Sequence, residues 1–402
     1  MLNIICRVIL GIVFVFSGFV KAVDPQGSAI KIAEYLEIIG LHNFETPGLI
    51  LAIVLSTLEF AIGFLLLFNL NIKKISPLAF VFMAFFTILT LYSAIYAPVS
   101  DCGCFGDAVK LTNWETFFKN LFLLPLSFYI YKKRNRNASS LSALKQNIGS
   151  IISILFIVGI SVNSIQHLPL LDFRPYKVGT NIEQGMSIPE GAPETVYETS
   201  FILEKDGEKK EFDEHNYPYN DTTWVFVEAK TKVVKEGYQA PIQNFILQSE
   251  DGLDISSDLI KHDKPVYLLI TPKIEKASEE SIEHLKAVHK LCMEKNFLFY
   301  VATASLPEDY YSFDSKHSCG FEYINADETL LKTICRGNPG LVILYKGTII
   351  AKYMHSDIPS INDLDNTLSH SIKSLKSSKD QWIVLFWALA LLGIIVLLYR
   401  IK

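Results

Sequence analysis

Six long apolar segments constrain how this chain can fold. A helix needs about 20 mostly apolar residues to cross a bilayer, and all but one of the segments reach or approach that length. The fourth is shorter and marginal on its own. The sequence therefore predicts a multi-pass membrane protein with one large soluble region before its last span. The segments are Leu2–Val23, Leu49–Leu70, Leu78–Ala97, Trp114–Tyr131, Ile148–His167 and Gln381–Leu398.

Clusters of Lys and Arg indicate how the spans are oriented. "NIKK", "YKKRNR" and "YRIK" follow the second, fourth and sixth segments, and such clusters stay on the cytoplasmic side. Both termini are then cytoplasmic, and residues 24–47, 101–113 and 168–380 lie outside. In a bacterium this describes an inner-membrane protein with a large periplasmic domain. No clean small-x-small cleavage site follows the first segment, so we expect it to be retained as a membrane helix.

The partners that composition predicts are lipids rather than nucleic acid. The formal net charge is −5, and the basic residues cluster beside the apolar segments rather than in one large patch. Nucleic-acid binding normally needs such a patch.

The soluble region shows an alternation of strand and helix patterns from about Lys264. Apolar residues recur at helical spacing in "EESIEHLKAVHKLCMEK", and Asp327 is a candidate N-cap for "DETLLKTI". "GLVILYKGTIIAKY" is typical of a hairpin, and a last helix is expected near Ile361–Leu375. Residues 168–236 predict a small β-rich layer before this α/β part. The other predicted strands are "PVYLLIT", "FLFYVATA" and "FEYINA".

This order resembles the thioredoxin fold over roughly Gly237–Leu375. The segment "RGNPGLVILYKG" is similar to the stretch of that family in which a cis proline lies beside the redox cysteines, which implies a cis Pro339. The upstream "GYQAPIQNFILQSEDG" resembles the lead-in of peroxiredoxin-like members. The place of the C-x-x-C motif reads "ITPKIEKASEES", without cysteine. A domain without those thiols cannot exchange disulfides there, so it could instead bind, position or cap.

The soluble region contains three other cysteines. Cys292 lies on the apolar face of its predicted helix and is expected in the core. Cys319 and Cys335 flank the third strand and the next helix. They are either two separate buried thiols or a structural disulfide, and the nearness of Cys335 to Pro339 leaves a redox role open.

The N-terminal third carries a second resemblance. "RVILGIVFVFSGFVKAVDP" is similar to the first helix of DoxX-like membrane proteins, and "LEFAIGFLLL" to their second. "CGCFGD", followed by a helix with Asn120, resembles the MauE branch of that group. The likeness covers about Met1–Arg136, and it implies a redox-associated membrane unit linked to periplasmic disulfide formation or to quinone. The matched positions are Arg7, Gly11, Phe14, Ser17, Gly18, Lys21, Asp24, Pro25, Glu59 and Gly63.

Cys102 and Cys104 form the one close cysteine pair of the chain, at the outer end of the third segment. A disulfide needs Cα atoms about 4.4–6.8 Å apart, which residues two apart reach only where the chain bends, and Gly103 permits the bend. Such a tight ring favours exchange over scaffolding. A structural disulfide and a metal site remain alternatives, although no neighbouring His or Cys would complete a metal site.

Charged residues near this pair have opposing effects. Asp101 and Asp107 flank the pair and disfavour a thiolate. Lys21, at the outer end of the first segment, could offset them.

Polar residues inside the spans are the remaining candidates. Glu59 and Asn120 are costly in lipid and should face the bundle interior, whereas Arg7 could reach the cytoplasmic surface. A quinone pocket in the bundle stays open, because no motif identifies quinone directly.

Together these patterns predict a helical membrane bundle with an α/β thioredoxin-like domain. The preferred function is thiol–disulfide electron transfer or protein maturation through Cys102 and Cys104, with a periplasmic thiol or disulfide as partner. The alternatives are a non-enzymatic scaffold that docks a periplasmic partner and a quinone-linked subunit with structural cysteines. The predicted divisions are 1–136, 137–147 (cytoplasmic loop), 148–167, 168–236, 237–375 and 381–398.

Overall fold

A computed structural model describes residues 1–38, 40–41, 45–97, 99, 102–136, 139, 141–235, 237–361, 364, 389–393 and 396. The chain divides into two compact units. The larger unit contains Met1–Gly179 and Ile246–Lys402, and the smaller contains Thr180–Phe245.

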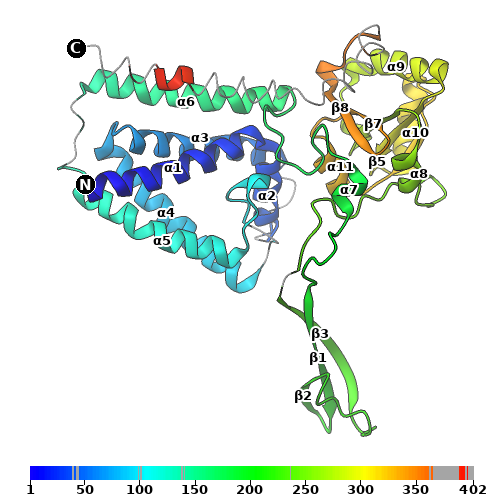
Figure 1. The fold of residues 1–402 in the computed structure, drawn as a ribbon, viewed down its shortest axis with the longest axis horizontal. Coiled ribbons are helices and arrows are strands. Elements are labelled where there is room, and N and C mark those ends of the chain that lie inside the picture. The colour runs from blue at the N-terminus through cyan, green and yellow to red at the C-terminus, as the bar shows by residue number, and fades with distance from the viewer. Residues whose placement is uncertain are drawn as a thin grey trace. The chain divides into compact units, whose positions relative to one another are not determined.

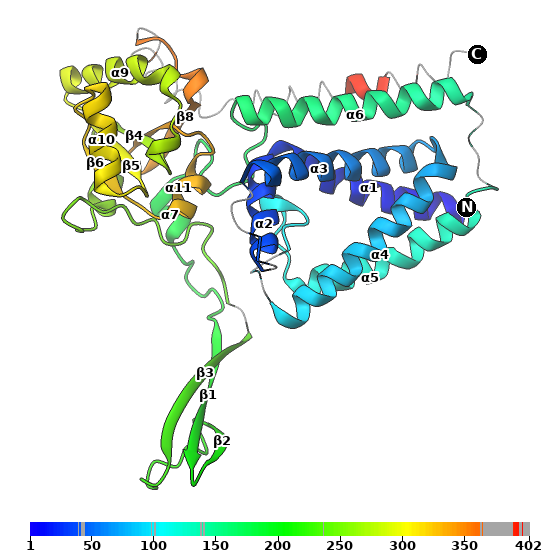
Figure 2. The same ribbon diagram turned by 180° about the vertical axis from the view of Figure 1, so that it is seen from behind.

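Long apolar helices form the N-terminal part of the larger unit, as Figures 1 and 2 show. Within the described residues, four helices are long and apolar enough to cross a membrane. They agree with the first, second, third and fifth predicted segments. These helices are α1 (Leu2–Val23), α3 (Glu45–Leu67), α4 (Ile72–Tyr96) and α6 (Ala143–Gln166).

The other two predicted spans have different outcomes. The fourth forms helix α5 (Asn113–Lys133), which packs along α4, but it is not among the four apolar helices. Its N-terminus is fixed by a capping box, in which Thr112 and Glu115 satisfy each other's backbone N–H groups. The sixth span and the predicted helix near Ile361–Leu375 lie largely outside the described residues.

Glycines let α1 and α3 approach closely. A Cβ added at Gly18 would meet the backbone of Ser56 and Phe60, and one at Gly63 would meet the backbone of Val15 and Gly11. Small residues allow such contacts between membrane helices. The close crossing brings the C-terminal half of α1 against the middle of α3.

The segment 24–47, predicted only as an outer loop, contains a helix. Helix α2 (Pro25–Ile38) follows α1 after the single residue Asp24, and it packs against α3. Proline suits the first position of a helix because it has no N–H to satisfy there. The sequence pattern missed α2 because it is too short and too polar to resemble a span.

The C-terminal part of the larger unit is an α/β fold, as predicted. Its five-stranded sheet has the order β6-β5-β4-β7-β8, in which β4, β5 and β6 are parallel and β7 and β8 are antiparallel. The predicted strands, hairpin and Asp327 cap are confirmed. The elements are α8 (Ser256–Lys261), β4 (Val266–Thr271), α9 (Ile282–Lys295), β5 (Leu298–Thr303), α10 (Pro307–His317), β6 (Tyr323–Asn325), α11 (Glu328–Ile334), β7 (Gly340–Tyr345) and β8 (Thr348–Met354).

The smaller unit contains the predicted β-rich lead-in. A short helix, α7 (Ile182–Met186), precedes an antiparallel sheet of order β2-β1-β3. The turn between the first two strands uses Asp206 and Gly207, both with positive φ, which is typical of tight hairpins. The strands are β1 (Val196–Lys205), β2 (Glu208–Asp213) and β3 (Val225–Lys235).

Candidate functional site

The two neighbouring cysteines lie in the loop between α4 and α5. Their Sγ atoms are 3.4 Å apart, both are free thiols, and both are half-buried. Gly103 between them has φ +64°, a left-handed conformation that other residues adopt at a cost. The bend expected at Gly103 is therefore present, and it places the thiols within reach of each other.

A buried polar cluster holds this loop by its backbone. The Cys104 carbonyl oxygen accepts a hydrogen bond of 2.7 Å from Lys21 Nζ and lies 2.8 Å from Ser17 Oγ. Lys21 Nζ also forms an ion pair of 2.7 Å with Glu59 and donates to Ser17. These three side chains are each less than 10% exposed. We name Ser17, Lys21 and Glu59 the loop anchor.

The surroundings of the pair distinguish its two thiols. Donation from Cys102, with the charges of Lys119 and Lys21, lowers the pKa of Cys104 to about 6 although burial opposes the shift. The hydrogen bond to Cys104 and burial raise the pKa of Cys102, and a hydrogen bond from Tyr35 only partly offsets this. Cys104 is therefore the thiolate of the pair and Cys102 keeps the proton.

Three residues of this site were not predicted as site residues. Tyr35 comes from the unpredicted helix α2, and its hydroxyl lies 3.0 Å from Ser93 Oγ of α4. Lys119 of α5 lies 4.2 Å from the centre of the Phe105 ring. Ser17 was noted only as a family position. A lysine one residue before Asn120, near the outer end of a span, is a signal that could have indicated Lys119.

A small cavity lies beneath Cys104, inside the bundle. Its volume is about 40 Å³, and its polar lining is Ser17, Glu59, Lys119 and Asn120. Asn120 donates to Thr90 Oγ1 over 3.2 Å, so it faces the interior as predicted. Such a volume holds about three or four water molecules, at about 10–15 Å³ each. The pocket of an organic cofactor occupies about 300–1,000 Å³. The residues around this cavity therefore do not fit a quinone ring as they are arranged here.

The other predicted residues lie apart from the dithiol. Arg7 is buried on α1, ten residues before Ser17. Asp107 lies in a short 3-10 helix after the pair, and Asp101 is outside the described residues. No group of three or more His, Cys, Asp or Glu residues within the described part of the chain could hold a metal ion.

The proline loop of the α/β part lies just before β7. The Asn338–Pro339 peptide bond is cis. Cys292, Cys319 and Cys335 are buried, separate free thiols. The structure thus contains no Cys319–Cys335 disulfide.

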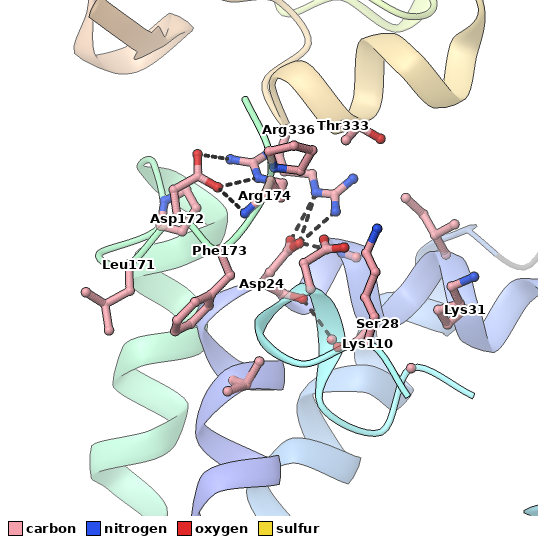
Figure 3. A pocket seen from close by; sticks show the side chains of 18 of the residues that line it. Asp24, Ser28, Lys31, Lys110, Leu171, Asp172, Phe173, Arg174, Thr333 and Arg336 are labelled. Atoms are coloured by element: carbon pink, nitrogen blue, oxygen red, sulfur yellow. Dashed lines mark hydrogen bonds and ion pairs between the residues drawn. The ribbon is translucent and has the colours of Figure 1, made fainter. Parts of the chain in front are cut away.

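An ion pair connects the predicted DoxX-like motif of the first helix with the predicted thioredoxin-like "RGNP" segment. Arg336, of the "RGNP" segment, binds Asp24, which follows the first membrane helix (Figure 3). Arg336 Nη2 lies 2.7 Å from Asp24 Oδ2, and Nε lies 3.1 Å from Oδ1. Burial raises the pKa of Asp24, but the charge and hydrogen bonds of Arg336 outweigh burial and lower it.

Fold and site together define a membrane-embedded helical unit with an anchored dithiol loop, fused to a C-terminal α/β domain. Residues 1–132 match the family of the methylamine utilisation protein MauE, so this part of the chain is a MauE-like membrane unit. Residues 197–236, which form most of the β1–β3 sheet, match a domain of unknown function, DUF8463.

One curated relative gives a longer alignment. The chain is 25% identical over 164 residues to "Protein TlpB" of Flavobacterium psychrophilum. The alignment covers 39% of this chain and 45% of the relative, so the chain spans less than half of that protein. No solved structure matches the sequence significantly.

Proposed function

We propose that Cys102 and Cys104 form a reversible dithiol/disulfide pair that exchanges electrons with protein thiols at the outer face of the membrane. The observation that carries this proposal is the 3.4 Å distance between two thiol sulfurs of opposite pKa shift. A thiolate beside a protonated thiol can exchange disulfides at neutral pH. The likeness of residues 1–132 to MauE agrees with this function.

The pKa difference assigns the two sulfurs different roles. In the oxidised pair, the thiolate of a partner dithiol attacks Cys102 Sγ, and Cys104 leaves, because the thiol of lower pKa is the better leaving group. This step leaves a mixed disulfide between Cys102 and the first partner sulfur. The second thiolate of the partner then attacks that first partner sulfur and forms the partner's disulfide. Cys102 departs and takes a proton. Two electrons pass from the partner to the pair, and the reverse sequence reduces a partner disulfide.

The α/β domain supports a docking role in this scheme. Its sheet order and cis Pro339 agree with a thioredoxin-like fold. Its described cysteines are all buried, so it would receive a partner without exchanging disulfides. The basic clusters of the sequence support a protein of the bacterial inner membrane whose α/β domain lies in the periplasm.

A trapping experiment tests the proposal. Cys104→Ser should accumulate a covalent, reductant-sensitive adduct with partner proteins through Cys102, because the resolving thiol is absent. Cys102→Ser should not accumulate one, and the double serine variant is the control for non-specific adducts. The full-length chain is expressed in bacteria, acid-quenched, and analysed by non-reducing gels and peptide mass spectrometry.

Two results would contradict the proposal. One is the absence of a Cys102 adduct in Cys104→Ser. The other is a Cys102–Cys104 disulfide that stays oxidised under strong reductant, together with a Cys102→Ser variant that exchanges disulfides with partner proteins as well as the wild type does. Retention of a partner by the double serine variant, without any adduct in Cys104→Ser, would favour the scaffold alternative.

A further inference from the structure

A second, larger cavity lies at the outer end of the membrane helices. Its volume is about 280 Å³. Its lining comes from the end of α1, from α2, from the loop that follows α6, from the dithiol loop and from α11. Figure 3 shows the charged side chains around it. We name it the outer cavity.

The buried ion pairs at the outer cavity contain one more cation than carboxylate, although one of these cations, Lys352, is not part of the cavity lining. Asp24 pairs with Arg336, while Asp172 pairs with both Arg174, at 2.8 Å, and Lys352, at 2.9 Å. Three cations therefore share two carboxylates. All three cationic side chains are at most 9% exposed, and a buried charge without a counter-charge is strongly disfavoured.

Arg174 contributes a donor without a partner to this wall. Its Nε and Nη2 bind Asp172, at 2.8 and 2.9 Å, whereas Nη1 has no hydrogen-bond partner among the described residues. The residue is only 2% exposed and lines the cavity. A buried guanidinium with one free N–H edge is suited to an anion.

The position of the outer cavity indicates where this anion comes from. Asp24 directly follows the last residue of α1, and Leu171 and Phe173 follow the end of α6 by a few residues. Both helices are apolar enough to cross a membrane and end here, so the cavity lies at the level of the lipid headgroups.

The remaining lining of the cavity suits an amphipathic ligand. Ile30, Leu171 and Phe173 supply apolar surface, and Lys31 and Lys110 are the other cationic residues of the lining. Glu34 pairs with Lys31, and the other acidic residues of the lining are Asp107 and the already paired Asp24 and Asp172.

From these observations we infer that the outer cavity binds the phosphate group of a phospholipid headgroup through Arg174. A phosphodiester carries one negative charge, which matches the one extra cation of the buried ion pairs around Arg174; the lining itself has four cations and four carboxylates, so the free N–H edge of Arg174 is what selects the anion. Basic pockets beside membrane helices bind anionic headgroups by the same combination of charge and hydrogen bonding. The bound lipid would sit between the dithiol loop and the helix that precedes the proline loop.

Two variants test this inference in the full-length protein. Arg174→Lys keeps the charge and removes the free N–H edge. Thr333→Trp fills the cavity from α11 and leaves the ion pairs intact. Lys290→Gln, far along the chain on α9 and absent from the cavity lining, is the matched control.

The readout is lipid retention. Each protein is released from nanodiscs of equal parts dioleoyl-phosphatidylglycerol and dioleoyl-phosphatidylcholine, and bound lipid is counted by native mass spectrometry. Thermal unfolding of lipid-stripped protein is measured with and without dioleoyl-phosphatidylglycerol or inorganic phosphate. We expect one retained phospholipid in the wild type and the control. In both variants we expect the affinity for the phospholipid to fall by about tenfold or more, as for the loss of a charge-assisted hydrogen bond.

Two results would overturn the inference or its source. Equal lipid retention by wild type, Arg174→Lys and Thr333→Trp overturns the inference. Stabilisation by inorganic phosphate that equals stabilisation by the lipid overturns the headgroup as the source. If Arg174→Lys does not fold, Thr333→Trp still tests the inference, because it leaves the ion pairs intact. If Thr333→Trp does not fold, Arg174→Lys gives the comparison with the wild type.

Discussion

Removal of the Lys21 ammonium from the loop anchor should strongly destabilise the membrane unit. Lys21 Nζ makes three contacts of 2.7–2.8 Å, with Glu59, Ser17 and the Cys104 carbonyl. Lys21→Met leaves the Glu59 carboxylate buried with only the Ser17 hydroxyl beside it. Loss of one partner of a buried ion pair costs about 3–5 kcal/mol in free energy of unfolding, and we expect a decrease of that size.

The assay for Lys21→Met is unfolding of the detergent-solubilised chain by increasing mole fraction of SDS. Lys286→Met is the control, because Lys286 forms an exposed ion pair with Glu283 of a kind that contributes little to stability. The double variant Lys21→Met/Glu59→Gln should be more stable than Lys21→Met alone, because no unpaired carboxylate remains. A decrease below about 1 kcal/mol for Lys21→Met, or no recovery in the double variant, would refute the reasoning.

Three further predictions concern other parts of the chain. Alkylation of Cys104 should be half-maximal at about pH 6, and Cys102→Ala should move this midpoint to higher pH, because the hydrogen bond that lowers the pKa of Cys104 is lost; an unchanged midpoint in a rate-versus-pH profile would count against the assigned thiolate. Asp172→Asn should reduce thermal stability by about 3–5 kcal/mol, because it leaves Arg174 and Lys352 buried without their shared carboxylate, and calorimetry beside the surface variant Asp258→Asn would measure this. Thr112→Ala should cost about 1 kcal/mol through loss of the capping box of α5, and an equally stable variant in SDS unfolding would contradict that account.

Much of the fold could be predicted because the signals are local. Spans such as Leu2–Val23 follow from length and apolar content, and β4 and α9 follow from periodicity. Helix α2 could not be predicted in this way, because its packing against α3 is a tertiary interaction that its own composition does not show. The character of α5 as a span stays a prediction for a similar reason, since polar residues such as Asn113, Glu115 and Lys119 dilute its apolar surface.

The candidate site was predictable in its residue types and less so in its contacts. The spacing of Cys102 and Cys104 identified the dithiol, and the cost of a charge in lipid identified Glu59. The contact of Lys21 with the loop was only a hypothesis, because the predicted topology puts Lys21 and Cys104 on the same side of the membrane but does not show that they touch. Tyr35 and Arg174 could not be found, because their roles depend on partners from other elements. The pair Asp24–Arg336 joins residues 312 positions apart.

The loop anchor binds a backbone carbonyl and not a sulfur, which separates the scaffold of this site from its chemistry. Any amino acid at position 104 presents the same oxygen to Lys21 and Ser17. Replacements of similar size, such as serine or selenocysteine, also fit beside the small cavity, so these variants report on reactivity without a change of the backbone contacts. The same independence would let the bundle serve as a rigid frame into which other reactive side chains, such as selenocysteine at position 104, could be introduced.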